Sequence, residues 1–174
     1  MSSLKFKQND FTVKKLDDKV DLSSFNCCDN DDLGLDEFIH KEAFEYQQQG
    51  MGVTYLFYND DQIAGYVTVA MGGIGVKITD VKVAVYDKKR YPALWLGRLA
   101  VHNKFRKRDV GKCMIQWVIG LAQKTAEDMG CRFIVLVTKG EQRIEFYTKC
   151  GFKVSHIELE DDAKMLFFPL PSKI

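Results

Sequence analysis

The stretch LGRLAVHNKFRKRDVGKCMIQWV, residues 96–118, constrains this chain more than any other part of its sequence. An apolar run ends at Val101, a short basic loop follows, and Gly111 stands where a helix begins. The first amides of a helix have no intrahelical acceptor, and the helix dipole adds partial positive charge there. A glycine at that point lets an anion approach the backbone. The stretch therefore predicts a strand, a phosphate-binding loop and a helix, in that order.

The charge around this loop differs from that of the chain as a whole. Residues 86–112 contain nine Lys or Arg and two Asp, whereas the full 174 residues have a net charge of +1. The near-neutral total argues against a dedicated nucleic-acid binder but allows a local basic patch. A solvated turn without a role is the alternative for such a charge run. The P-loop pattern GxxxxGK[ST] is absent. The candidate phosphate site is therefore the start of the helix at Gly111.

The hydrophobic pattern indicates one mixed α/β domain over residues 1–174. The continuous apolar run at 133–137 is typical of a buried strand, as in parallel sheets. The glycines between 72 and 75 are expected in a loop. Strands are expected at 11–16, 53–58, 63–70, 81–85, 93–101, 133–137, 152–157 and 165–170, and helices at 36–49, 110–129 and 142–149.

Other features bear on cofactors and location. The five cysteines form no CxxC pair, so free thiols in a reduced compartment are expected. The three histidines are far apart, so no metal site is expected. No apolar run approaches the length of a membrane span, and residues 1–10 lack a signal-peptide core. We therefore expect a cytoplasmic protein that does not attach to a membrane.

Three motifs occur in the order and at the separations typical of one family. LGRLAV lies on a predicted strand, RKRDVG matches the Q/R-x-x-G-x-G/A pyrophosphate loop, and FYTKCGF follows near the end. In these motifs the chain resembles the GNAT superfamily of acetyl-CoA-dependent N-acetyltransferases. Asp109 stands where the family has its first loop glycine. Asp adopts unusual backbone angles more readily than most residues, so the turn is expected to form.

Three further segments, FNCCDNDDLGLDEFIHKEA, IAGYVTVA and YPALWLGRLAV, resemble one branch of that family. This branch comprises GNAT toxins that acetylate the α-amino group of aminoacyl-tRNA. The resemblance extends from Phe25 to Phe152. It makes tRNA a candidate partner beside peptides and small amines, and a homodimer is the assembly considered.

The family resemblance implies a fold and a co-substrate. The fold is a mixed central sheet of about six to seven strands flanked by helices, with a splayed strand pair that holds the cofactor. The co-substrate is acetyl-CoA, whose acetyl group passes to a primary amine by direct attack in a ternary complex. The implied cofactor contacts are Leu99, Ala100, Val101, Arg106, Lys107, Arg108, Asp109, Val110, Gly111 and Lys112.

Tyr147, in FYTKCGF, maps onto the family's tyrosine that protonates the departing thiolate. A phenol with a pKa of about 10 stays protonated at neutral pH and can donate to a thiolate with a pKa of about 8.5. A core tyrosine on a short amphipathic helix is the alternative. Neither of the strands at 93–101 and 133–138 carries a carboxylate that could act as a base. An α-amine, with a pKa of about 7.7–8.0, loses its proton more readily than a lysine and is the favoured acceptor.

The segment before the motif LGRLAV is basic and aromatic, and the acceptor is expected to approach along it. Packing residues beside a solvated turn are the alternative for this segment. A toxin acting on charged tRNA and a non-catalytic CoA-binding module remain alternatives to the general N-acetyltransferase. The candidate acceptor-binding residues are Lys88, Lys89, Arg90, Tyr91, Trp95 and Arg98.

Overall fold

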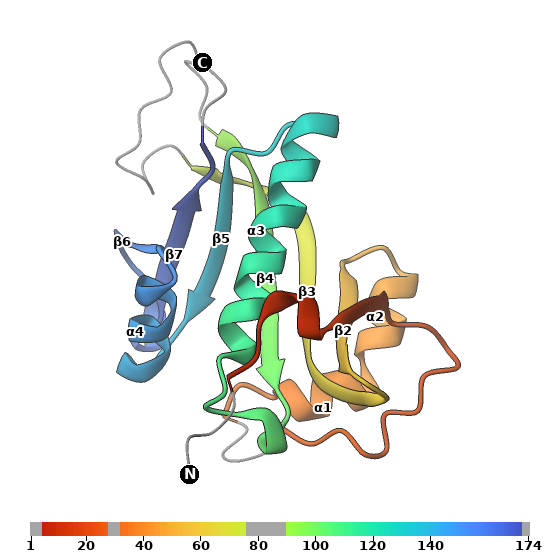
Figure 1. The fold of residues 1–174 in the computed structure, drawn as a ribbon. Coiled ribbons are helices and arrows are strands. Elements are labelled where there is room, and N and C mark those ends of the chain that lie inside the picture. Colours follow the sequence, from red (N-terminus) through yellow and green to blue (C-terminus); the bar gives the residue numbers. More distant parts are fainter. Residues whose placement is uncertain (1–4, 28–31, 76–89, 172–174) are drawn as a thin grey trace. The chain divides into compact units, whose positions relative to one another are not determined.

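A computed structural model describes residues 5–27, 32–75 and 90–171. Within these residues, seven strands form one mixed sheet in the order β1-β2-β3-β4-β5-β7-β6 (Figure 1), which confirms the predicted α/β class. None of the described helices has both the length and the apolar character needed to cross a membrane. The elements are η1 (Gln8–Asp10), β1 (Thr12–Lys15), α1 (Leu35–Lys41), α2 (Ala43–Gln48), β2 (Val53–Asn59), β3 (Gln62–Gly75), β4 (Arg90–Val101), η3 (Asn103–Phe105), α3 (Val110–Asp128), β5 (Phe133–Thr138), α4 (Glu141–Lys149), β6 (Lys153–Glu158), η4 (Glu160–Asp162) and β7 (Lys164–Pro169), where η marks a 3-10 helix.

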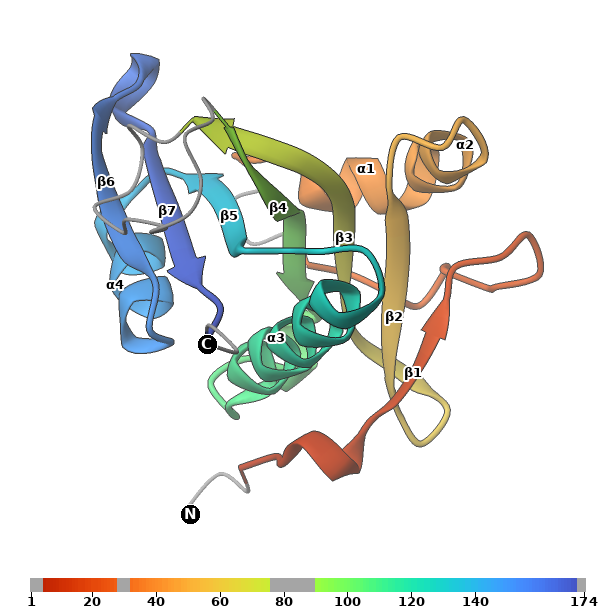
Figure 2. The ribbon, with the colours of Figure 1, turned by 90° about the horizontal axis from the view of Figure 1, so that it is seen from above.

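The chain divides into two compact units, the first of which comprises residues 1–70 and 97–117. Its strands β1, β2 and β3 pair antiparallel. Figure 2 shows α1 and α2 on one side of β2 and β3, and the first turns of α3 on the other. Successive side chains of a strand point to opposite faces, so β2 contacts both layers. Leu56 joins the core cluster of Phe38, whereas the Phe57 ring lies 5.3 Å from the ring of Trp117 in α3.

Gly65 marks a close approach of β3 to its neighbours in this unit. A β-carbon at this position would lie 2.6 Å from the Ala100 carbonyl oxygen and 2.8 Å from the Met114 sulfur. The Ala100 contact involves backbone, so rotating a side chain cannot relieve it. Tight packing in a protein interior transmits such an overlap into the neighbouring elements.

Gly65→Ala is therefore expected to lower the free energy of unfolding by about 2–3 kcal/mol through overpacking. Gly120→Ala is the matched control, because Gly120 lies within α3 and a β-carbon there would meet nothing within 4 Å. That change is expected to raise the free energy of unfolding by about 0.5–1 kcal/mol, since alanine favours the helix over glycine. Urea unfolding measures both variants, and equal midpoints would contradict the packing described for Gly65.

The second unit comprises residues 71–96 and 118–174. β5 pairs antiparallel with β7 over its full length and parallel with β4 at Ala93–Trp95. This arrangement confirms the strand predicted at 133–137 and its parallel pairing with one neighbour; residues 133–136 are buried, whereas Val137 is exposed. Phe133 and Phe167 lie in the core of this unit, with ring centroids 6.1 Å apart. In Figure 1, α4 lies beside β6 and β7.

Two predicted elements differ from the structure, and a third cannot be compared. The single helix predicted at 36–49 is two helices, because Glu42 leaves the helical region with φ −120° and ψ −31°. The glycines at 72–75 extend β3 instead of forming a loop. A β-carbon on Gly72 would lie 2.8 Å from the ring of Trp95, so a glycine lets β3 pass this indole. The strand predicted at 81–85 lies outside the described residues.

Candidate active site

The loop between η3 and α3 turns through two residues with a left-handed backbone. Lys107 has a φ of 59° and Asp109 a φ of 63°. Aspartate is one of the few residues besides glycine that enter this region readily. Asp109 thus makes the turn at the position where the family has a glycine, as the sequence predicted.

Helix α3 starts directly after this turn. The Cys113 N–H donates to the Asp109 carbonyl oxygen at 3.0 Å. The amides of Val110, Gly111 and Lys112 precede this bond in the chain and have no acceptor within the helix. Gly111 is half-buried and Lys112 is exposed. Free amides at the positive end of a 19-residue helix form a site that can bind an anion.

Arg106 ties the loop to the end of β4. Its Nε donates to the Val101 carbonyl oxygen at 3.4 Å, and its Nη2 donates to the Cys27 carbonyl oxygen at 2.6 Å. The sequence placed Arg106 among the charges of a basic loop, whereas in the structure its guanidinium holds the backbone. Within residues 104–112, the exposed basic side chains are Lys104, Lys107 and Lys112.

His102 fixes the turn that follows β4. Its Nδ1 accepts the Lys104 N–H at 3.1 Å, so this ring nitrogen carries no proton. Its Nε2 therefore donates to the Ser24 carbonyl oxygen, which lies 3.0 Å away. The neighbouring Asn103 N–H donates to the Asn26 carbonyl oxygen at 2.9 Å. Residues 24–27 thus support the predicted cofactor loop from a distant part of the chain.

All the predicted cofactor residues lie in the first unit, within the segment 99–112. Along the end of β4, Leu99 and Val101 are half-buried and Ala100 is buried. Arg108 is half-buried in the loop, and its guanidinium lies 4.3 Å from the centre of the Phe6 ring. The splayed strand pair and the cofactor contacts themselves stay predictions.

Tyr147 lies in the second unit, on α4, and is 9% exposed. Its ring packs against Phe146 and Phe152, with centroid distances of 5.1 and 5.7 Å. Burial raises the pKa of the Tyr147 phenol above its ordinary value; Cys150 adds to the rise and Arg143 opposes it. Among the described residues, the hydroxyl has no hydrogen-bond partner. The phenol is thus neutral, protonated and able to donate.

Tyr91 and Trp95, predicted to face the acceptor, have packing contacts in the second unit. Tyr91 is 7% exposed, and its ring lies 5.5 Å from that of Phe133 in the core. Trp95 is half-buried and packs against the same core cluster. These core contacts are of the kind that the packing alternative for this segment predicts, and a role of Tyr91 in acceptor binding stays a prediction.

The predicted basic acceptor residues have different surroundings. Arg98 is half-buried in the first unit, with its guanidinium 3.5 Å from the centre of the Phe38 ring and 5.7 Å from that of Tyr46. These contacts hold the cation against α1 and α2. Arg90 is exposed at the start of β4. Lys88 and Lys89 lie outside the described residues.

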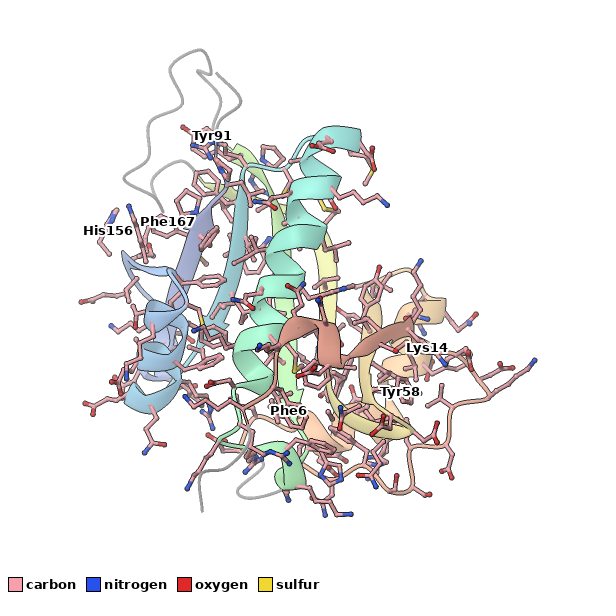
Figure 3. All side chains as sticks on the ribbon, in the orientation of Figure 1. Phe6, Lys14, Tyr58, Tyr91, His156 and Phe167 are labelled. Atoms are coloured by element: carbon pink, nitrogen blue, oxygen red, sulfur yellow. The ribbon has the colours of Figure 1, made fainter. Side chains whose placement is uncertain are left out.

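Sequence reasoning missed the part played by the N-terminal segment Lys5–Phe11, here called the N-terminal strap. The Phe6 N–H donates to the Arg108 carbonyl oxygen at 3.0 Å, and Lys5 Nζ lies 3.1 Å from Asp109 Oδ2. Figure 3 labels Phe6, which lies near the segment leading into α3. The only local signal was a phenylalanine between two lysines, which does not identify a partner so far along the chain.

A comparison with protein families identifies the fold. A family model described as an acetyltransferase (GNAT) domain matches residues 50–154. The chain belongs to the GNAT acetyltransferase family. The matched span contains β4, the basic loop and Tyr147, the three parts of the resemblance found in the sequence. This GNAT protein is an N-acetyltransferase.

Known proteins with similar sequences or structures include toxins. The tRNA-acetylating toxin of Mycobacterium tuberculosis (strain ATCC 25618 / H37Rv) is 24% identical over 142 residues, which are 82% of this chain and 84% of the relative. AtaT complexed with acetyl-methionyl-tRNAfMet has a TM-score of 0.80 at 20% identity, covering 91% of this chain and 94% of its own. A tyrosine-to-phenylalanine mutant of AtaT, bound to the C-terminus of the antitoxin AtaR and acetyl-CoA, has a TM-score of 0.73 at 20% identity, covering 92% and 93%.

Proposed function

We propose that this GNAT acetyltransferase transfers the acetyl group of acetyl-CoA to the α-amine of an aminoacyl-tRNA. The observation that carries the proposal is the turn through Asp109 into the free amides of α3, at the end of β4. The acceptor class is taken from the tRNA-acetylating relative, which aligns with 82% of the chain. A single domain over residues 1–174, a homodimer and a cytoplasmic location stay predictions beside it.

The loop suits the diphosphate of acetyl-CoA. The amides of Val110, Gly111 and Lys112 would donate to it, and the exposed ammonium groups of Lys107 and Lys112 would offset its charge. Arg106 would act indirectly, by fixing the loop backbone. The strand end, Leu99 to Val101, would pair with the pantetheine through its backbone.

Tyr147 would act as the general acid. Acetyl-CoA supplies an acetyl thioester, and the C–S bond breaks as the C–N bond to the amine forms. Tyr147 Oη donates its proton to the departing sulfur, and the phenolate regains a proton from water. The nitrogen releases its extra proton to water, since β4 and β5 carry no carboxylate. Burial raises the pKa of Tyr147, so the phenol is in the acid form that this role requires at neutral pH.

Transfer of a radiolabelled acetyl group from acetyl-CoA tests the acceptor. Separate reactions contain aminoacyl-tRNA, the same tRNA without its amino acid, a peptide with a free N-terminus, and small amines. Label is expected in the aminoacyl-tRNA alone. Label in the peptide or the small amines but not in the tRNA would overturn the proposed acceptor. Binding of acetyl-CoA without transfer to any amine would instead favour a non-catalytic module.

Reversing the charges of Lys88, Lys89 and Arg90 tests the tRNA contact. The triple variant Lys88→Glu, Lys89→Glu, Arg90→Glu is expected to abolish acetylation of aminoacyl-tRNA and flatten its salt dependence, while acetyl-CoA binding persists. The control is Lys14→Glu, Lys15→Glu, Lys19→Glu, which changes the net charge equally at three exposed positions. Equal losses in both variants would indicate a general charge effect and contradict a specific contact.

A further inference from the structure

If the start of α3 holds the diphosphate of acetyl-CoA, as the proposed function requires, the negative charge of Asp109 must be balanced. Asp109 directly precedes α3 and is therefore next in the chain to the amides proposed to hold a diphosphate. A negative charge there opposes the binding of an anion, and a glycine in the same turn would not. Aspartate fits the turn because it can adopt the left-handed φ of 63°. Its negative charge still has to be balanced by another group.

The N-terminal strap supplies the balancing charge. Lys5 Nζ lies 3.1 Å from Asp109 Oδ2, and the two side chains are 72% and 40% exposed. Both groups thus keep contact with solvent, so their pairing reduces the field of the carboxylate without burying either charge. Lys5 is the only described residue that forms a salt bridge with Asp109.

Backbone bonds and ring contacts hold the strap in place beside the loop. The Phe6 N–H donates to the Arg108 carbonyl oxygen at 3.0 Å, and Cys113 Sγ donates to the Phe6 carbonyl oxygen at 3.5 Å. The Phe6 ring lies 5.8 Å from that of Phe105. These contacts join the strap to residues on both sides of Asp109, so Lys5 is positioned by more than its own ion pair.

The other end of the strap is also fixed. The Asn59 side-chain amide donates to the Asp10 carbonyl oxygen at 3.1 Å, and the Phe11 ring lies 6.5 Å from that of Phe57. Both ends of the strap are therefore held by contacts within the first unit. An anchored segment loses less entropy in holding an ion pair than a free terminus would.

We propose that Lys5 is a positioning residue for acetyl-CoA: it neutralises Asp109, so that a loop with aspartate in place of glycine still accepts a diphosphate. Lys5 acts through Asp109. Its contribution should therefore vanish when position 109 carries no charge. The geometry gives a direct test, because glycine adopts the same positive φ without a carboxylate.

A double-mutant cycle read by calorimetry of acetyl-CoA binding tests this proposal. In the natural chain at low salt, Lys5→Ala is expected to weaken binding about two- to five-fold, the size typical of an exposed charge pair. In the Asp109→Gly background the same change is expected to have little effect. Lys5→Arg should retain the natural affinity, and the loss in Lys5→Ala should shrink at high salt as charges are screened.

Lys7→Ala is the matched control, since it removes an exposed charge from the same strap and no described residue forms a salt bridge with Lys7. It should leave affinity close to that of the natural chain. Equal losses from Lys5→Ala with aspartate or glycine at position 109, or no loss in either, would overturn the proposal for Lys5 alone. A natural chain that does not bind acetyl-CoA would overturn the proposed function together with it.

Discussion

Replacing Tyr147 by phenylalanine is expected to lower kcat by about 10²- to 10⁴-fold, the usual contribution of a positioned general acid. Acetyl-CoA affinity should remain close to that of the natural chain. The substitution removes one hydroxyl and keeps the ring, whose contacts with Phe146 and Phe152 are apolar. A fall in kcat without a change in binding identifies an interaction made in the transition state.

Tyr55→Phe is the matched control for this change. Burial also raises the pKa of Tyr55, and its ring packs on Trp117 with a centroid distance of 4.7 Å. Removing that hydroxyl should leave kcat unchanged. A folded Tyr147→Phe protein with the kcat of the natural chain would remove Tyr147 from the mechanism. Loss of thermal stability in step with kcat would instead indicate a packing role.

The same tyrosine determines the expected pH profile. Because burial raises the pKa of Tyr147, its acid form persists to a higher pH than that of an ordinary tyrosine, whose pKa is about 10. Below that value the donor stays protonated, so kcat/KM for the acceptor should not fall on the basic side. On the acid side it should fall as an α-amine with a pKa of about 7.7–8.0 gains a proton. A decline between about pH 8 and 9.5 would indicate a different proton donor.

Local chemistry explains why the β4–loop–α3 segment could be predicted from the sequence. A strand, a turn residue and a helix start each leave a signal within a few positions of one another. The positive φ of Asp109 follows from the same local preference of aspartate for such turns. Strand β5 was equally visible, because a strand with buried residues on both faces is a continuous apolar run, although Val137 near its end is exposed.

Contacts between distant segments explain what the sequence did not reveal. Arg106 looked like one more cation of a basic loop, but its guanidinium binds the carbonyl oxygen of Cys27, 79 positions away. Lys5 is an ordinary surface lysine until the fold places it beside Asp109. The glycines near 72 looked like a loop because nothing local shows that Trp95 needs the space beside the strand.

Gly111→Val is expected to weaken acetyl-CoA binding by about 10- to 100-fold. Gly111 is the second residue of α3, where backbone amides are proposed to meet the diphosphate. A branched side chain there would hold the phosphate away from the backbone and remove charge-assisted hydrogen bonds, each contributing about 1.5–3 kcal/mol. Gly111 has no positive φ, so valine can adopt its backbone conformation and the protein is expected to fold.

Gly120→Val provides the control on the same helix, because a β-carbon at Gly120 meets nothing within 4 Å. Both variants exchange glycine for valine in α3 and should change the stability of the helix to a similar extent. Only Gly111→Val should reduce the affinity measured by calorimetry. Unchanged affinity in a folded Gly111→Val protein would move the diphosphate away from the start of α3. Equal losses in both variants would assign the effect to the helix as a whole, since only position 111 lies in the first turn.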